Sequence, residues 1–293
     1  MYHPTAHLLL KQLLPELRKE AGNKNIADFE RRYIALFSDI YERFHKLYGQ
    51  HPESVQAFNK LSHVLLQGFL KRSAYLKKSD QEREQNPAWF RSQEINGMML
   101  YVDRFNKDLN GLIDKADYFE ELGINFLHLM PLLDSPKIKN DGGYAVSNYR
   151  KIDSRFGTNA NFKKATKSLR DRDMLVMMDL VVNHTSDEHD WAMKAKAGDA
   201  NYQDFYHAFE DRSVAYMYER SMPEVFPESA PGNFTFNQEM QKWVMTVFNT
   251  YQWDLNYANP NVLVEMLDVI LYLANMGVDV FRMDAVAFVW KQI

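Results

Sequence analysis

The sequence of 293 residues contains no cysteine. This absence excludes disulfides, thiolate zinc sites and cysteine nucleophiles at once, and it leaves no need for an oxidising compartment. A cytoplasmic location is therefore expected.

A surplus of positive charge is also missing. Lysine and arginine total 35 against 39 acidic residues, which gives a formal charge of -4. Because proteins that bind nucleic acid through its phosphates normally carry a basic surplus, we expect no nucleic acid partner. The leucines between residues 8 and 14 are interrupted by Lys11 and Gln12, with neither a basic leader nor a small-residue cleavage site. We expect a helix there, and neither a signal peptide nor a membrane anchor.

Apolar residues are plentiful, at 46% of the chain with 14% aromatic, which is enough for a large core. Up to about Pro87 the apolar positions recur at helical spacing. The clearest series is Phe29, Tyr33, Phe37, Tyr41 and Phe44. The pattern predicts an all-helical N-terminal domain over residues 1–92.

Strand and helix patterns alternate after that point. Apolar runs at 98–105, 124–132, 174–186 and 278–285 predict strands, and the segments 117–123, 161–173 and 261–277 predict helices. This alternation indicates a parallel sheet, and we expect an α/β fold that forms the first half of a (β/α)₈ TIM barrel. The barrel would occupy residues 93–185, then helix 3, strand 4 and the start of the next helix over 258–293. An aromatic, aperiodic inserted subdomain would fill 186–257.

Polar residues gather where the predicted strands end, which is where barrels place their active sites. They are Asp103, Asp141, Tyr144, Asp179, Asn183, His184, Arg282 and Asp284. Since residues two apart on a strand share a face, Arg282 should hold Asp284 ionised, as a carboxylate nucleophile requires. The spacing alone fits a buried structural ion pair equally well.

Two further features have a structural alternative. His128 lies within an apolar strand, which favours a hydrogen-bonded core histidine, and we assign it no role. The aromatic residues Phe248, Trp253 and Tyr257 suit stacking on sugar rings, but aromatics in an inserted subdomain more often form its core.

Four segments in order resemble the conserved regions of the α-amylase superfamily, glycoside hydrolase family 13. They are DGGYAVSNY at 141–149, DLVVNH at 179–184, the insertion that follows, and VFRMDAV at 280–286. Within that superfamily the chain looks like the amylosucrase subgroup, because of GGYAV, HLMPL, FNTYQWDLNYANP, RMDAVAFVWKQ and the helical N-terminal domain.

This resemblance implies a role for six residues. Asp284 matches the nucleophile and Arg282 the arginine that orients it. The substrate-binding matches are His184 at the glucosyl ring, Tyr144 as stacking platform, Asp141 at the pocket floor and Phe248 in the sucrose pocket. The implied reaction splits sucrose through a glucosyl-enzyme ester, passes glucose to an α-1,4-glucan and releases fructose.

The resemblance also implies what is not needed and what would come later. Asn183 matches a calcium ligand of true α-amylases, but amylosucrases are described as independent of calcium, so we expect no metal and no cofactor. The acid/base glutamate and the transition-state aspartate would both follow Ile293. The 293-residue chain is therefore expected to be inactive or poorly folded by itself.

Other functions remain open at this stage. A sucrose hydrolase would share every residue named above. Trehalose synthase or α-glucosidase activity fits GGYAV and the helical domain less well, and a non-enzymatic glycan-binding fragment is the alternative from a different class. The oligomeric state is not predicted.

Overall fold

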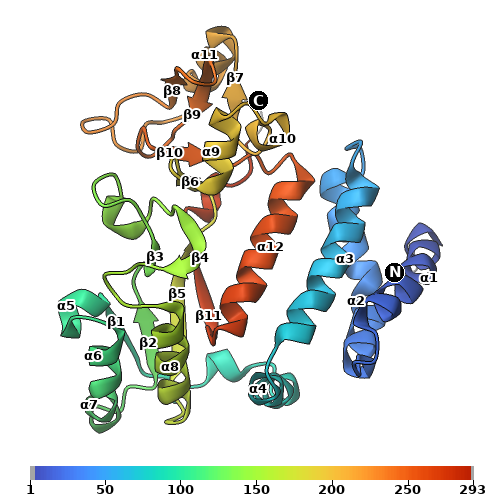
Figure 1. Cartoon of the computed structure of the whole chain (residues 1–293), viewed down its shortest axis with the longest axis vertical. Helices are drawn as coiled ribbons and strands as arrows, with labels where there is room; N and C mark the ends of the chain where they lie inside the picture. Colours follow the sequence, from blue (N-terminus) through green and yellow to red (C-terminus); the bar gives the residue numbers. More distant parts are fainter. Residues whose placement is uncertain (1–3, 292–293) are drawn as a thin grey trace. The chain divides into compact units, whose positions relative to one another are not determined.

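A computed structural model of the protein describes residues 4–291. Residues 1–3 of the predicted first helix and 292–293 of the predicted last segment lie outside the described residues. The chain forms two compact units, which are Met1–Glu82 with Ala258–Asn275, and Arg83–Tyr257 with Met276–Ile293 (Figure 1).

The first unit is helical. Its helices are α1 (Pro4–Ala21), α2 (Ala27–Tyr48), α3 (Ser54–Lys71), most of α4 (Ala74–Gln85) and α12 (Pro260–Asn275). The five aromatic residues predicted to share one face of α2 are all buried, and the Tyr33 hydroxyl donates to Ser62 Oγ at 2.7 Å. The helical period read from the sequence is therefore confirmed.

Helix α12 was assigned to the barrel by its place in the sequence, yet it joins the core of the first unit. It packs along α3, and Val264 belongs to the same buried cluster as the aromatic residues of α2 (Figure 1). Gly68 makes this packing possible, because a Cβ there would lie 2.8 Å from Leu271 Cδ1. The predicted cap is present, since Asn259 Oδ1 accepts from the backbone N of Asn261 at 2.9 Å.

The second unit contains a four-stranded parallel sheet in the order β1-β2-β5-β11 (Figure 1). The strands are β1 (Gly97–Leu100), β2 (Phe126–Leu129), β5 (Leu175–Val181) and β11 (Val280–Asp284). Three of them lie within their predicted apolar runs. The run 98–105 is only partly a strand, because β1 begins at Gly97 and residues 102–105, Asp103 among them, belong to helix α5 (Val102–Asn106). The order of the four strands along the sheet is that of the first half of a barrel. Among the described residues β1 and β11 are the edges of this sheet.

Short elements connect these strands. Between β1 and β5 they are α5 (Val102–Asn106), α6 (Leu109–Asp114), α7 (Ala116–Glu121), β3 (Leu133–Asp134), η2 (Asp141–Gly143), β4 (Asn148–Ile152) and α8 (Asn159–Arg170), with η1 (Trp89–Arg91) before β1. The predicted glycine cap after α7 is confirmed, because Gly123 has a φ of 69°.

The insertion after β5 has its own small sheets. It contains β6 (His184–Ser186), α9 (Asp190–Lys196), α10 (Ala200–Gln203), β7 (Ala208–Phe209), α11 (Arg212–Glu219), β8 (Phe234–Asn237), β9 (Lys242–Met245) and β10 (Gln252–Asp254). Strand β10 pairs antiparallel with β6, so Asp254 lies opposite His184. The end of the insertion is thereby fixed beside the end of β5.

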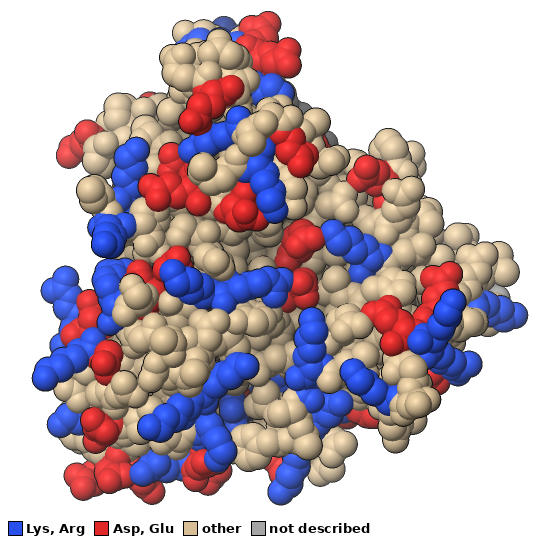
Figure 2. Space-filling view, viewed as in Figure 1, with Lys and Arg blue, Asp and Glu red and all other residues tan. Residues whose placement is uncertain are grey.

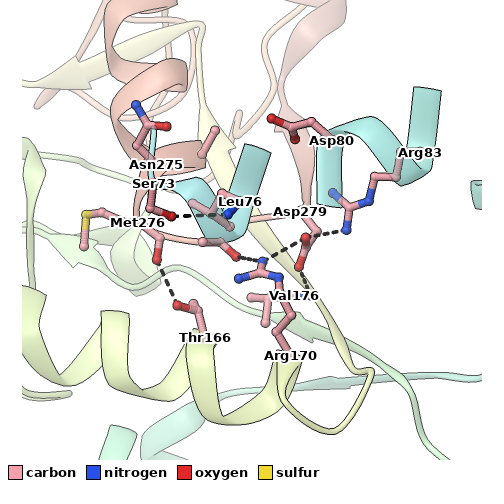
Figure 3. Close-up of polar contacts among 12 residues, drawn as sticks. Ser73, Leu76, Asp80, Arg83, Thr166, Arg170, Val176, Asn275, Met276 and Asp279 are labelled. Carbon is pink, nitrogen blue, oxygen red and sulfur yellow. Dashed lines mark hydrogen bonds and ion pairs between the residues drawn. The ribbon is translucent and has the colours of Figure 1, made fainter. Parts of the chain in front are cut away.

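A buried ion cluster lies near the start of β5 and β11 (Figure 3). The Asp279 side chain is only 2% exposed and accepts from Arg83 Nη2 at 2.6 Å, Arg170 Nη2 at 2.9 Å and the backbone N of Val176 at 2.9 Å. We call these four residues the Asp279 cluster. It joins the end of α8 to β5 and to the segment that leads into β11.

No helix within residues 4–291 is long and apolar enough to cross a bilayer. Basic and acidic side chains are mixed on the face drawn in Figure 2, where neither sign forms a continuous field.

Candidate active site

Two carboxylates and one arginine meet at the C-terminal ends of β5 and β11. Arg282 lies opposite Asp179 in the strand register. Its Nη1 donates to Asp179 Oδ1 at 3.0 Å and to Asp284 Oδ1 at 2.7 Å. The sequence predicted the pairing of Arg282 with Asp284. The structure adds that the same nitrogen serves a second carboxylate.

These three side chains differ in how much of each is accessible to solvent. Asp179 is fully buried, whereas 17% of the Asp284 side chain and 44% of the Arg282 side chain remain accessible. Burial by itself would lower the pKa of Arg282, but the hydrogen bond and charge of Asp179, with the charge of Asp284, raise it. The guanidinium therefore stays charged, and it holds one oxygen of Asp284 while part of that side chain stays accessible.

The turn after β3 presents Asp141 and Tyr144. Its backbone is left-handed at Asp141 with φ 48°, at Gly142 with φ 68° and at Gly143 with φ 100°. A Cβ at Gly143 would lie 2.8 Å from Pro131 Cβ, so the second glycine is required for space as well. The Tyr144 hydroxyl donates to Asp179 Oδ2 at 3.2 Å, and burial, helped by Asp179, raises its pKa. The phenol thus stays protonated.

His184 is buried in a network of amides. Its Nε2 lies 3.0 Å from Gln252 Nε2 and 3.2 Å from the carbonyl oxygen of Tyr144, and its Nδ1 lies 3.2 Å from Asn183 Nδ2. Gln252 Nε2 also donates to Asp141 Oδ2 at 3.1 Å. Gln252 therefore connects two residues that the sequence placed in the substrate pocket.

The surroundings of His184 favour its neutral form. Burial lowers the pKa of the imidazole, against a smaller opposite effect of Asp254 and Asp284. The hydrogen bonding agrees, because Nδ1 faces the amide donor of Asn183 and must accept from it, whereas Nε2 can donate to the carbonyl oxygen of Tyr144. A neutral histidine can exchange hydrogen bonds with hydroxyl groups without adding a charge to the site.

Lys291 joins this network from the segment that follows β11. After Asp284 the chain turns sharply at Ala285, with φ 51°, into the short helix η3 (Val286–Phe288). Lys291 Nζ then donates to Asn183 Oδ1 at 2.8 Å and pairs with Asp254 Oδ1 at 3.0 Å. The oxygen of Asn183 that resembles a calcium ligand is therefore bonded to an ammonium group.

No group of three or more His, Asp or Glu side chains converges as a metal site within residues 4–291. The expectation that the protein needs no metal stays a prediction.

Phe248 lies against this network and continues it with aromatic side chains. Its ring centroid is 4.9 Å from that of His184 and 5.2 Å from that of Phe288. Beyond Phe288 lies a cavity of about 230 Å³ that is also lined by Pro223 and Trp290. The cavity is lined by residues 217–223 of the inserted subdomain and by residues 287–291, which include Lys291 of the network.

The structure brings all six predicted site residues into one connected group around Asp179, Gln252 and Phe248. Asp103 is exposed and bonds only locally, to the backbone N of Arg104 at 3.0 Å. Sequence reasoning missed Gln252, Asp254 and Lys291. Only the β10–β6 pairing and the turn after β11 bring these residues to His184, although their polar character inside apolar segments was visible.

Comparison with known families agrees with this geometry. A family model described as "Alpha amylase, catalytic domain" matches residues 75–293. A trehalose synthase/amylase TreS of Mycolicibacterium smegmatis is 37% identical over 63% of this chain and 30% of its own length. An oligo-1,6-glucosidase of Heyndrickxia coagulans is 36% identical over 63% of this chain and 32% of its own length. The chain thus spans about a third of the length of these curated relatives.

Solved structures give the same picture. A mutant of MutB in complex with the substrate sucrose matches with a TM-score of 0.62 and 27% identity, over 71% of this chain and 37% of the other. An isomaltulose synthase mutant from Erwinia rhapontici NX5, in complex with its natural substrate sucrose, has a TM-score of 0.59 and 28% identity, over 68% and 36%.

Proposed function

Because the chain belongs to the α-amylase catalytic-domain family, we propose that it carries the nucleophile half of an amylosucrase active site. The observation that carries the proposal is the accessible Asp284 carboxylate, bonded at 2.7 Å to an arginine that is itself fixed by the buried Asp179. The donor substrate would be sucrose and the acceptor an α-1,4-glucan.

The chemistry would follow the retaining route of two displacements. Asp284 attacks the anomeric carbon of the glucosyl unit, the bond to the fructosyl oxygen breaks, and that oxygen receives a proton from a general acid. The resemblance assigns this acid to a glutamate that follows residue 293 in chain order. In retaining enzymes the two carboxyl groups lie about 5 Å apart across the bond. The glucan 4-hydroxyl then attacks the anomeric carbon and displaces the Asp284 carboxylate, while its proton passes to the conjugate base of the same general acid.

The remaining residues would bind the glucosyl unit. Tyr144 offers its ring as a platform, while His184 and Asp141 offer hydrogen-bonding groups that Gln252 holds together. Arg282 orients Asp284 through the hydrogen bond from its Nη1 to Asp284 Oδ1. Two similar structures contain sucrose, which supports this disaccharide as the donor.

The test is sucrose turnover by the full-length gene product, with fructose and free glucose measured separately. We expect more fructose than glucose, with the missing glucose found in a glucan. Asp284→Asn should abolish both products. Asp171→Asn is the matched control, because Asp171 forms an exposed pair with Lys167 at the end of α8, before the start of β5, whereas the site lies at the C-terminal end of that strand. Equal fructose and glucose would instead identify a sucrose hydrolase.

A second candidate is favoured by the curated relatives, whose names are trehalose synthase and oligo-1,6-glucosidase. Both would use the same nucleophile and glucosyl pocket. Conversion of maltose to trehalose, or cleavage of isomaltose, at a rate above that of sucrose would replace the amylosucrase assignment. Glucan binding with no turnover of any α-glucoside would favour a binding function.

A further inference from the structure

One buried polar group beside the site has no hydrogen-bond partner among the described residues. His128 Nε2 is buried, makes no hydrogen bond and lies 3.4 Å from Asp179 Oδ1. A buried nitrogen in this state is costly, because it has lost water without gaining a partner. The nearest recorded acceptor is the carboxylate that holds Arg282.

The strand register explains why these two groups meet. His128 on β2 lies opposite Met177 on β5, and Asp179 is two residues further along β5. Side chains two apart on a strand share a face, so His128 and Asp179 both point to the inner face of the sheet, one layer apart. The 3.4 Å distance exceeds a usual N–H···O bond by a few tenths of an ångström. A small side-chain rotation therefore closes it.

The charges at the site connect this contact with the orientation of Asp284. Asp179 and Asp284 share the single guanidinium of Arg282 through the same Nη1 atom. Asp179 is fully buried, so the fewer hydrogen-bond donors it has, the more strongly it attracts the guanidinium of Arg282. A second donor on Asp179 Oδ1 would weaken this attraction and leave Arg282 directed at Asp284.

We propose that His128 is a positioning residue whose Nε2–H donates to Asp179 Oδ1. With this donor in place, Arg282 Nη1 stays directed at Asp284 while it also contacts Asp179. The inference rests on the proposed function, since its consequence is the orientation of the nucleophile. It replaces the expectation that His128 is a core histidine without a role. His128 acts through Asp179 and Arg282.

The first experiment is a double-mutant cycle on stability, which needs no substrate. Urea unfolding of the full-length protein is compared for His128→Leu, Asp179→Leu and the double variant, because leucine removes the acceptor whereas asparagine would keep it. If the hydrogen bond exists, the double variant loses clearly less stability than the sum of the single variants. Additive effects would overturn the proposal.

The second experiment separates positioning from packing. His128→Leu should lower kcat about 10-fold with KM little changed, since the nucleophile is misdirected while the sugar still binds. His128→Gln, whose amide N–H reaches about as far as the ring Nε2, should recover most of the loss. The matched control is Phe126→Leu, two residues earlier on the same face of β2, which removes volume without a donor and should keep kcat within about twofold.

The outcomes are distinct. If His128→Leu and Phe126→Leu lower kcat equally, or if His128→Gln fails to recover activity, the positioning role is wrong even with coupled stabilities. If the wild-type protein turns over no α-glucoside, the proposed function fails. The stability cycle then decides by itself whether His128 donates to Asp179.

Discussion

The adjacent strands β5 and β11 carry an aspartate–arginine cluster at each end, and the two clusters differ in what they leave accessible. At the start of β5 and β11, Asp279 is 2% exposed and receives donors from two arginines and a backbone amide (Figure 3). At the other end Arg282 serves both Asp179 and Asp284, and Asp284 remains partly exposed.

The difference shows how to distinguish a structural ion cluster from a reactive one. The carboxylate of Asp279 has both oxygens engaged by the fold, so it is held but cannot reach a substrate. Asp179 has the same structural role in the cluster that it forms with Arg282 and Asp284. Asp284 is oriented through one oxygen and open to solvent, which is the condition for nucleophilic attack.

The largest contrast should come from neutralising one aspartate at each end. Asp284→Asn should lower kcat of the full-length protein by about 10⁴-fold, equivalent to roughly 5 kcal/mol of transition-state stabilisation. Its unfolding free energy should change by less than about 1 kcal/mol, because the side chain is partly exposed. Sucrose kinetics and urea unfolding on one preparation test both statements. A large loss of stability would show that Asp284 is structural.

The converse is expected for Asp279→Asn. Removing this charge leaves Arg83 and Arg170 near a neutral buried amide, and breaking a buried ion pair costs about 3–5 kcal/mol. Urea unfolding measures this loss. The exposed pair of Asp171 with Lys167 is the control, and Asp171→Asn should cost less than about 1 kcal/mol. Equal losses for the two variants would contradict the structural role of the Asp279 cluster.

Acid should first lower the stability of the insertion and of the network around His184. Burial lowers the pKa of His189 and of His207 to about 4, and it also lowers the pKa of His184. These histidines are neutral in the folded protein but take up protons in the unfolded chain below about pH 6.5. Folding stability therefore falls as the pH decreases from about 6.5 to about 4.

For each of His189 and His207 the loss at pH 5 is on the order of 2 kcal/mol. Urea midpoints at pH 7 and pH 5 measure the total, and hydrogen exchange locates it. Protection should decrease first around β6 and β7, and later around Val176 in the Asp279 cluster. Unchanged exchange at β6 and β7 at pH 5 would argue against neutral buried histidines.

The smallest expected effect is that of Gln252→Met. The substitution keeps a similar shape but removes the amide that bridges Asp141 and His184. The loss of one buried hydrogen-bonding group should cost about 1–1.5 kcal/mol, seen as a KM raised about 10-fold with kcat nearly unchanged. A fall in kcat alone would show that Gln252 acts on the nucleophile rather than on sugar binding.

Much of the fold was readable because it depends on local periodicity. The aromatic series of α2, the four strands and the glycine after α7 appear where the sequence predicts them. Helix α12 shows the limit of this reading. Its boundaries followed from its cap and its period, but its packing on α3 depends on surface complementarity between segments about 200 residues apart, as the contact of Gly68 with Leu271 shows.

The sequence by itself determined that Arg282 and Asp284 share a face, because a period of two along a strand is a local property, and it predicted which residues would carry the chemistry. Only the tertiary structure decided that Asp179 lies opposite Arg282, that Gln252 bridges Asp141 and His184, and that His128 reaches toward Asp179. The physical reason is that strand register and loop closure are set by packing across the whole sheet, and no single segment contains that information.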